Sequence, residues 1–269
     1  ALGAAIGIFR AGKTLGKSVS IVVNDPTKSI RPLIAGYVNN PDYEPSMFVD
    51  SEQAKDMVDN NTVVVVVDTN RPSYTECEEL LHMTKTIVVL DHHRRGSEVI
   101  ENAVLSYVEP YASSACEMVS EILQYTYDNI KIRTEEADCM YSGIMIDTNN
   151  FMTKTGVRTF EAAAWLRKSG ADTVAVKLLF QNDLHATLDR YEIIQHAEMY
   201  RGNIALCCLD YTSDRIIAAQ AADELLNISG IEASFVFYPD GNRVICSARS
   251  IGEANVRMIL EPLGGGGNQ

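Results

Sequence analysis

The chain has 269 residues, of which 46% are hydrophobic and 22% are charged, and this ordinary globular composition excludes a mainly disordered protein. Lysine and arginine number 23 against 36 aspartate and glutamate, which leaves a net charge of −13. That excess of negative charge argues against a surface for duplex nucleic acid, because such a surface needs cations to neutralise phosphates. No apolar run reaches the ~18 residues of a membrane span, so we expect a soluble chain.

Six cysteines are spread along the chain without a CxxC pair. Most of them lie in apolar runs, such as residues 205–209 and 244–248. This placement predicts small buried side chains in a reducing cytoplasm, and a zinc site or a disulfide framework is the less favoured alternative.

The first half of the chain alternates between strand-like and helix-like segments. Continuous runs of β-branched residues predict strands covered on both faces, at residues 18–23, 62–67 and 86–90. Apolar periodicity predicts helices at residues 4–16, 51–60, 75–84, 114–127, 134–146 and 158–169. This alternation is typical of an α/β fold with a doubly wound, mostly parallel sheet.

The pattern changes after a helix that is predicted at residues 188–200. Short strands are predicted at residues 203–210, 233–238 and 243–247, with a turn at 239–242, and helices at residues 213–226 and 255–260. We therefore expect a larger α/β domain over residues 1–183, which the residues discussed next indicate to be the catalytic one, a connecting helix over 184–201 and a smaller α/β domain over 202–269, across a cleft.

Acidic and imidazole side chains follow three apolar segments that are read here as strands. They are Asp68 after residues 63–67, Asp91-His92-His93 after residues 87–90, and Asp147 after residues 143–146. Open α/β sheets bind their ligands at the carboxyl ends of strands. A single aspartate in such a place is commonly a helix cap or a turn former, but three groups at one sheet edge indicate a site.

A mixture of carboxylate and imidazole ligands fits Mn²⁺, Mg²⁺ or Fe²⁺ better than it fits structural zinc, which favours thiolates. Two such ions, about 3.5–4 Å apart, can activate a water molecule and hold the oxygens of a phosphoryl group. Asp91 need not touch a metal, because a carboxylate behind a histidine can set the histidine tautomer. The pattern therefore predicts metal-dependent chemistry on a phosphate ester.

The triplet Asp91-His92-His93 after an apolar strand resembles the signature of the DHH phosphoesterases. The resemblance implies that Asp68 bridges two metal ions, that His92 and Asp147 are further ligands, and that His93 lies against the phosphate as part of the catalytic set. It implies Mn²⁺ as the metal, with Mg²⁺ or Fe²⁺ as alternatives.

The C-terminal region resembles the DHH-associated domain, whose arginine and glycine-rich loop hold the substrate. The matching segments are residues 247–250, 255–256 and 264–267. The resemblance implies substrate contacts from Ser113, Ser114, Arg249, Ser250, Gly264, Gly265, Gly266 and Gly267. For Ser113 and Ser114 an N-cap role is the alternative, and Arg158 has a phosphate or a local carboxylate as its possible partner.

Five longer segments indicate which group within this family the chain resembles. Residues 64–73, 90–95, 108–125, 143–151 and 155–167 are similar, in order and spacing, to the catalytic module of bacterial cyclic-di-AMP phosphodiesterases of the GdpP/YybT type. The resemblance implies hydrolysis of cyclic-di-AMP to linear pApA. The alternatives are a nanoRNase-type hydrolase of short oligoribonucleotides or pApA, a type II pyrophosphatase, and a nucleotide-binding sensor without catalysis.

Full-length members of that family carry transmembrane helices, a PAS domain and a degenerate GGDEF domain before this region. The resemblance therefore implies a membrane-anchored parent with this module at the cytoplasmic face, and we expect a homodimer. It also places a His-x3-Asp-x-Asp cluster of metal ligands directly before Ala1, and a histidine where this chain has Asn268. Ala1 is accordingly expected to lie beside Asp68.

Overall fold

The structure is a computed structural model that describes residues 1–269 except 28–29, 97, 127–129, 182, 252–253 and 266–269. The chain forms two compact units, an N-terminal unit over Ala1–Phe180 and a C-terminal unit over Gln181–Gln269. Each unit has its own sheet and its own hydrophobic core. None of the helices in the described part of the chain is long and apolar enough to cross a membrane.

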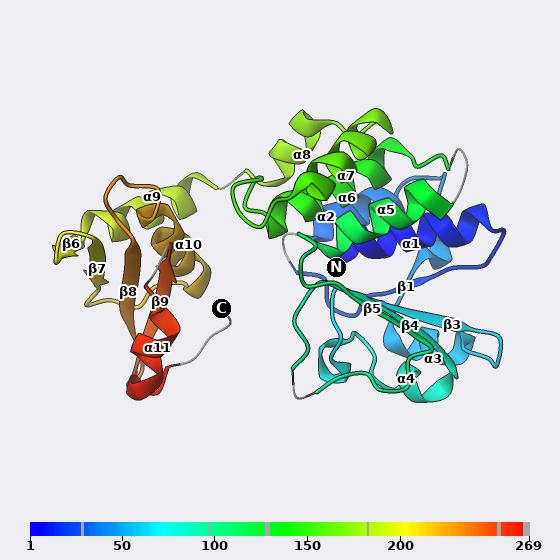
Figure 1. Cartoon of the computed structure of the whole chain (residues 1–269), viewed down its shortest axis with the longest axis horizontal. Helices are drawn as coiled ribbons and strands as arrows, with labels where there is room; N and C mark the ends of the chain where they lie inside the picture. The colour runs from blue at the N-terminus through cyan, green and yellow to red at the C-terminus, as the bar shows by residue number, and fades with distance from the viewer. Residues whose placement is uncertain (28–29, 97, 127–129, 182, 252–253, 266–269) are drawn as a thin grey trace. The chain divides into compact units, whose positions relative to one another are not determined.

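Parallel strands form the centre of the N-terminal unit, as the β-branched runs predict (Figure 1). One sheet contains β3 (Val63–Val67), β4 (Thr86–Asp91) and β5 (Leu105–Val108), and a short second sheet pairs β1 (Ile21–Val22) with β2 (Phe48–Val49). The strand expected at residues 18–23 therefore pairs over only two residues. Neither β2 nor β5 was expected, because each has too few residues for a clear alternation.

Helices cover both faces of the β3–β4–β5 sheet (Figure 1). Val65 and Val67 pack toward one core with residues of several long helices, whereas Val66 and Val89 pack with Leu81 of a short helix on the other face. The helices are α1 (Leu2–Thr14), α2 (Arg31–Val38), α3 (Ser51–Met57), α4 (Leu80–Met83), α5 (Ala115–Thr126), α6 (Thr134–Asp147), α7 (Val157–Lys168) and α8 (Thr173–Leu179), with 3-10 turns at Pro45–Met47 and Pro72–Tyr74.

Two predicted elements of this unit are wrong. The helix expected at residues 75–84 shrinks to α4, because Thr75 is extended (ψ 152°) and ends the turn that Pro72 begins. Residues 143–146 are expected both as the end of a helix over 134–146 and as a strand before Asp147; the helix is confirmed as α6, so Asp147 ends a helix rather than a strand. A four-residue apolar run does not distinguish a strand from a buried helix turn, and here Ile144 is buried in the helical core.

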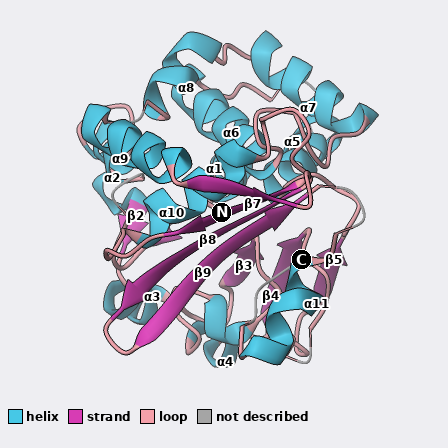
Figure 2. Cartoon of the chain, turned by 90° about the vertical axis from the view of Figure 1, so that its left-hand side faces the viewer, coloured by secondary structure: helices cyan, strands magenta, loops and turns pink. Residues whose placement is uncertain are grey.

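The C-terminal unit is a mixed four-stranded sheet with helices packed against it (Figure 2). The order is β6–β7–β8–β9, and only the β7–β8 pair is parallel. Gly241 has a positive φ of 58° in the tight turn between β8 and β9, a conformation that glycine adopts without strain. The elements are α9 (Leu184–Gln195), β6 (Ala197–Tyr200), β7 (Ile204–Cys208), α10 (Arg215–Leu225), β8 (Ala233–Asp240), β9 (Arg243–Ser250), α11 (Val256–Leu260) and a 3-10 turn at Glu261–Leu263.

The connecting helix expected over residues 184–201 is too long. Helix α9 ends at Gln195, and residues 197–200 form the edge strand β6, which pairs antiparallel with β7. Antiparallel pairing with the next strand, across the turn at residues 201–203, overrides local helix preference here. Of the cysteines, Cys77, Cys116, Cys139 and Cys207 are buried as expected, but Cys208 is exposed at the end of β7.

Close packing of α1 against α5 and α6 holds the end of α6 next to the sheet. A methyl group added at Gly3 would lie 2.6 Å from the carbonyl oxygen of Cys139 and 2.8 Å from Sγ of Cys116. We expect Gly3→Ala to lower the free energy of unfolding by ~1–3 kcal/mol, the usual cost of overpacking. Denaturant unfolding followed by the fluorescence of Trp165, the single tryptophan, measures this in the N-terminal unit.

The matched control is Gly36→Ala in α2, where nothing lies within 4 Å of an added methyl group. This exposed helical position should gain ~0.5–1 kcal/mol from the substitution. If both variants unfold at the same denaturant concentration, the close approach of α1 to its neighbours at Gly3 does not contribute to the free energy of unfolding.

Candidate metal centre

Asp68 and the Asp91-His92-His93 segment meet at the carboxyl edge of the β3–β4–β5 sheet. The registered pair Val67 and Leu90 puts the two strand ends side by side, and the amide of Asp68 donates to the carbonyl of Leu90 over 2.9 Å. Asp68 itself has a positive φ of 66°, which costs a non-glycine residue about 1–3 kcal/mol and is typical of functional sites.

His92 stands between two carboxylates. Its Nε2 atom lies 3.3 Å from Oδ1 of Asp68 and 3.8 Å from Oδ2 of Asp147. Ligand atoms of Asp68, His92 and His93 lie within 4.8 Å of one another, a spacing that fits a shared cation. Within the described residues, Oδ1 of Asp68 is buried without an aligned hydrogen-bond donor, so a metal ion would supply the missing partner.

The charges at this edge favour a cation. The Ala1 nitrogen lies 2.6 Å from Oδ2 of Asp68, as expected for this end of α1. Burial raises the pKa of Asp68, and the hydrogen bond and charge of His92 lower it. Burial and repulsion from Asp68 raise the pKa of Asp147. The paired carboxylates therefore repel each other unless positive charge lies between them.

Asp91 is the completely buried end of β4 and orients His93, the role expected for it. Its Oδ1 atom accepts hydrogen bonds from Nδ1 of His93 over 2.7 Å and from the backbone N–H of His93 over 3.2 Å. Because a carboxylate only accepts, the proton of the neutral imidazole lies on Nδ1, and Nε2 carries the free lone pair. The hydrogen bond to Asp91 also raises the pKa of His93.

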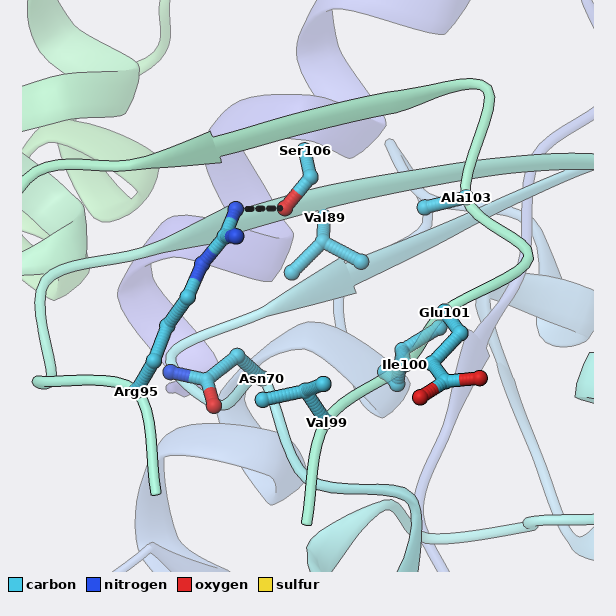
Figure 3. A pocket seen from close by; sticks show the side chains of 8 residues that line it. All are labelled: Asn70, Val89, Arg95, Val99, Ile100, Glu101, Ala103 and Ser106. Atoms are coloured by element: carbon cyan, nitrogen blue, oxygen red, sulfur yellow. Dashed lines mark hydrogen bonds between the residues drawn. The ribbon is translucent and has the colours of Figure 1, made fainter. Parts of the chain in front are cut away.

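The sequence analysis did not identify Asn70 as a member of the site. This residue follows β3 and is only 4% exposed, and its Nδ2 atom donates to Oδ2 of Asp91 over 2.5 Å. It lines a cavity of about 260 Å³ beside β4 and β5, where Arg95 donates to Ser106 (Figure 3). Its position two residues after Asp68 was the one available signal, and polar loop residues are too common for that to be specific.

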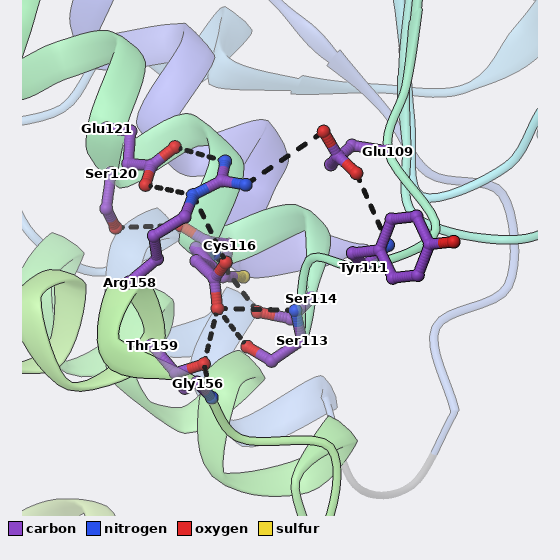
Figure 4. A network of polar contacts seen from close by, with 11 residues as sticks. Glu109, Tyr111, Ser113, Ser114, Cys116, Ser120, Glu121, Gly156, Arg158 and Thr159 are labelled. Carbon is purple, nitrogen blue, oxygen red and sulfur yellow. Dashed lines mark hydrogen bonds and ion pairs between the residues drawn. The ribbon is translucent and has the colours of Figure 1, made fainter.

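Ser113 and Ser114 are buried at the start of α5, where the carboxylate of Glu117 organises them (Figure 4). Ser114 caps the helix by accepting a hydrogen bond from the amide of Glu117 over 3.0 Å. Ser113 Oγ and Thr159 Oγ1 donate to Oε2 of Glu117 over 2.5 Å and 2.7 Å. The cap role is therefore present in the structure, and substrate contact stays a prediction. Glu117 was missed, because nothing in the sequence distinguishes it from a surface glutamate of α5.

Arg158 pairs with a local carboxylate. Its Nε and Nη2 atoms donate to the two oxygens of Glu121 over 2.7 Å and 2.6 Å, and Nη1 lies 3.9 Å from Glu109 (Figure 4). Of the two partners considered for Arg158, this is the one present in the structure.

The predicted substrate residues of the C-terminal unit lie on β9 and after α11. Arg249 donates from Nε to Asp223 of α10 over 2.7 Å, and Ser250 is the last residue of β9. Gly264 has a positive φ of 80°, and Gly265 donates its N–H to the carbonyl of Leu260. Gly266 and Gly267 lie outside the described residues. Contact of these residues with substrate remains a prediction.

Comparison with known proteins agrees with this geometry. The sequence model of the DHH family, N-terminal domain, matches residues 1–144. The chain is 41% identical to the cyclic-di-AMP phosphodiesterase GdpP of Bacillus subtilis (strain 168) over 99% of this chain and 41% of that protein. It is 37% identical to the cyclic-di-AMP phosphodiesterase PdeA of Listeria monocytogenes serotype 1/2a (strain 10403S), also over 99% and 41%.

The chain thus spans about two fifths of the length of the curated relatives that it matches. A crystal structure of an exopolyphosphatase-related protein from Bacteroides fragilis has a similar fold, with a TM-score of 0.79 and 18% identity over 98% of this chain and 80% of that one. This likeness supports the mixed α/β architecture with parallel sheets.

The effect of Asp91 on the pKa of His93 can be tested without substrate. Asp91→Asn keeps the shape of the side chain but removes its negative charge, so the pKa of His93 should fall in the metal-free protein. NMR titration of the histidine ring protons measures the change, and a His93→Gln sample assigns the resonance among the five histidines. The exposed Asp25→Asn variant should leave the pKa of His93 unchanged; an equal shift in both variants would contradict the assignment.

Proposed function

Because the chain belongs to the DHH family, we propose that it is a metal-dependent phosphodiesterase that hydrolyses cyclic-di-AMP to linear pApA. The grouping of Asp68, His92 and His93 within 4.8 Å, with Asp147 beside His92, is the observation that carries this proposal. The names of the GdpP and PdeA relatives, which match this chain almost from end to end, support the cyclic dinucleotide as substrate.

In this proposal Asp68, His92 and Asp147 would hold two divalent ions, with Asp68 as the shared ligand, and His93 would contact the phosphate through its free Nε2 atom. Divalent ions at such a centre supply Lewis acidity and make water a nucleophile at neutral pH. Mn²⁺ is the proposed metal, with Mg²⁺ and Fe²⁺ as alternatives, because the ligands are carboxylates and imidazoles. A cluster of ligands preceding Ala1 in a longer chain would reach this centre, since the Ala1 nitrogen lies 2.6 Å from Asp68.

The residues of the chain then have separate tasks. Asp68 and Asp147 would bind the metal ions, whose positive charge offsets the carboxylates that would otherwise repel an anionic substrate at this sheet edge. Buried Asp91 keeps the His93 ring in one orientation. We further propose that the segment of Ser113 and Ser114, with Arg249, Ser250 and the glycines from Gly264 to Gly267, binds the nucleotide. The parent protein is proposed to be a membrane-anchored homodimer that acts at the cytoplasmic face and does not bind duplex nucleic acid.

Removal of the bridging carboxylate tests the metal centre. Asp68→Asn should lower the rate of cyclic-di-AMP hydrolysis in Mn²⁺ more than about a hundredfold, because metal stabilisation of a phosphoryl transition state is worth several kcal/mol. Asp25→Asn, at an exposed position, is the matched control. The fluorescence of Trp165 verifies that both variants are folded.

The rates should be measured on the cyclic and the linear dinucleotide in parallel. A faster rate on pApA than on cyclic-di-AMP would favour the nanoRNase-type alternative. Asp68→Asn activity within tenfold of wild type would exclude Asp68 as a bridging ligand.

Arg249 provides a second test, in the C-terminal unit. A charged hydrogen bond to a phosphate is worth about 1.5–3 kcal/mol, so Arg249→Ala should raise KM for cyclic-di-AMP roughly tenfold to a hundredfold. Asp223→Ala is the matched control, because it breaks the same ion pair but keeps the arginine. If the two variants have the same KM, then Arg249 acts only as the partner of Asp223.

A further inference from the structure

The side chain of Asn70 links the loop after β3 to the end of β4. Its Nδ2 atom donates to Oδ2 of Asp91 over 2.5 Å and lies 3.3 Å from the carbonyl oxygen of His93, which it also contacts as a donor. Asp91 in turn accepts from Nδ1 and from the backbone N–H of His93. The three residues form one chain of hydrogen bonds that begins in the loop of Asp68 and ends at the His93 ring.

Both oxygens of the Asp91 carboxylate are therefore bonded, one to Asn70 and the other to His93. A buried carboxylate that is bonded on both sides has one orientation. Without the Asn70 amide, Oδ2 of Asp91 would lose this donor at a place with no solvent exposure, and the carboxylate would turn to recover a partner. Any such turn moves the acceptor that fixes the tautomer and the tilt of the His93 ring.

We propose that Asn70 is a positioning residue that acts through Asp91 to hold His93 for contact with the substrate phosphate. The inference rests on the proposed function for the role of His93, and on the geometry alone for the link between Asn70 and His93. Asn70 itself touches no reacting atom in this proposal.

The role of the side chain is separable from that of the loop backbone. The carbonyl of Asn70 accepts a hydrogen bond from the amide of Ile100 over 2.9 Å, so the backbone is anchored without the amide group. The Oδ1 atom is buried and lacks a hydrogen-bond partner among the described residues. Only the Nδ2 donor is therefore in use, and its removal should affect Asp91 and His93 before it affects the fold.

The cavity beside Asn70 allows a rescue variant. Its volume of about 260 Å³ and its apolar walls of Val89 and Ile100 leave room for a ring (Figure 3). In Asn70→His the Nδ1 atom takes the branch position of the amide nitrogen and can donate to Asp91. Asn70→Ala removes the donor without adding bulk. Asn102→Ala is the control, because Asn102 also donates through Nδ2, to the carbonyl of Leu81 over 2.8 Å, but away from the site.

The experiment measures kcat and KM for cyclic-di-AMP in saturating Mn²⁺. Loss of a residue that orients a catalytic-site group typically costs 10- to 100-fold, so we expect kcat of Asn70→Ala to fall about tenfold to a hundredfold, with KM within about threefold. Asn70→His should return kcat to within about fivefold of wild type, and Asn102→Ala should match wild type. A purely structural role would not produce rescue by a donor.

A second readout does not depend on activity. Long-range ¹H–¹⁵N NMR of the metal-free protein, labelled at histidine, reports which ring nitrogen of His93 is protonated. We expect Nδ1 protonation in wild type and in Asn70→His, and a mixture of both tautomers in Asn70→Ala. If Asn70→Ala does not fold, Asn70→Ser replaces it, because the shorter hydroxyl does not reach Oδ2 of Asp91.

The inference is overturned if Asn70→Ala keeps both kcat within twofold of wild type and His93 protonated at Nδ1. It is also overturned if Asn70→His and Asn70→Ala are equally impaired. If the wild-type protein does not hydrolyse cyclic-di-AMP, the proposed function fails, and the tautomer of His93 alone then decides the role of Asn70.

Discussion

The parallel register of β3 and β4 is the constraint on which the metal centre depends. Because Val67 pairs with Leu90, the residues that follow the two strands leave the sheet at the same edge. The positive φ of Asp68 then turns its carboxylate toward His92 instead of along the strand. A slip of one residue would move Asp68 by about 3.3 Å along the strand relative to Leu90, so the register of the two strands fixes the ligand geometry.

Helix packing brings the remaining proposed ligand, Asp147, to the sheet edge. Asp147 comes from the end of α6, and this helix reaches the sheet edge because α1, α5 and α6 approach one another closely at Gly3. The strain at Asp68 and the repulsion between Asp68 and Asp147 both oppose folding. The packing of the surrounding core outweighs both, and a cation between the carboxylates would relieve the repulsion.

Buried carboxylates orient the polar groups at the sheet edge and at the start of α5. Asp91 accepts from Asn70 and His93, and Glu117 accepts from Ser113 and Thr159. Each carboxylate accepts hydrogen bonds from more than one segment, which joins loops and helices that meet only in the folded state. In a chain of net charge −13, an anionic substrate needs a local source of positive charge, and metal ions provide it more compactly than surface arginines. The arginines that the described residues offer are partly engaged, Arg158 with Glu121 and Arg249 with Asp223.

The sequence by itself determined the α/β class, the strands β3 and β4, and the acidic and imidazole residues after them. These features are local: β-branched runs and the residues that end them are contiguous in the chain, and parallel strands bring their ends together. The same reasoning identified Asp147 as a site residue but placed it after a strand, because a short apolar run has no periodicity of its own. The resemblance to the DHH phosphoesterases rested on the same contiguous motifs.

Only the tertiary structure decided which polar residues become buried partners of the site. Asn70 and Glu117 look like ordinary loop and helix residues in the sequence, and they gain their roles from contacts with residues far along the chain, such as Asp91 and Thr159. It also decided that residues 197–200 form a strand, because β6 exists through its ladder with β7. Burial and long-range hydrogen bonding depend on which segments meet, and no local pattern of side chains carries that information.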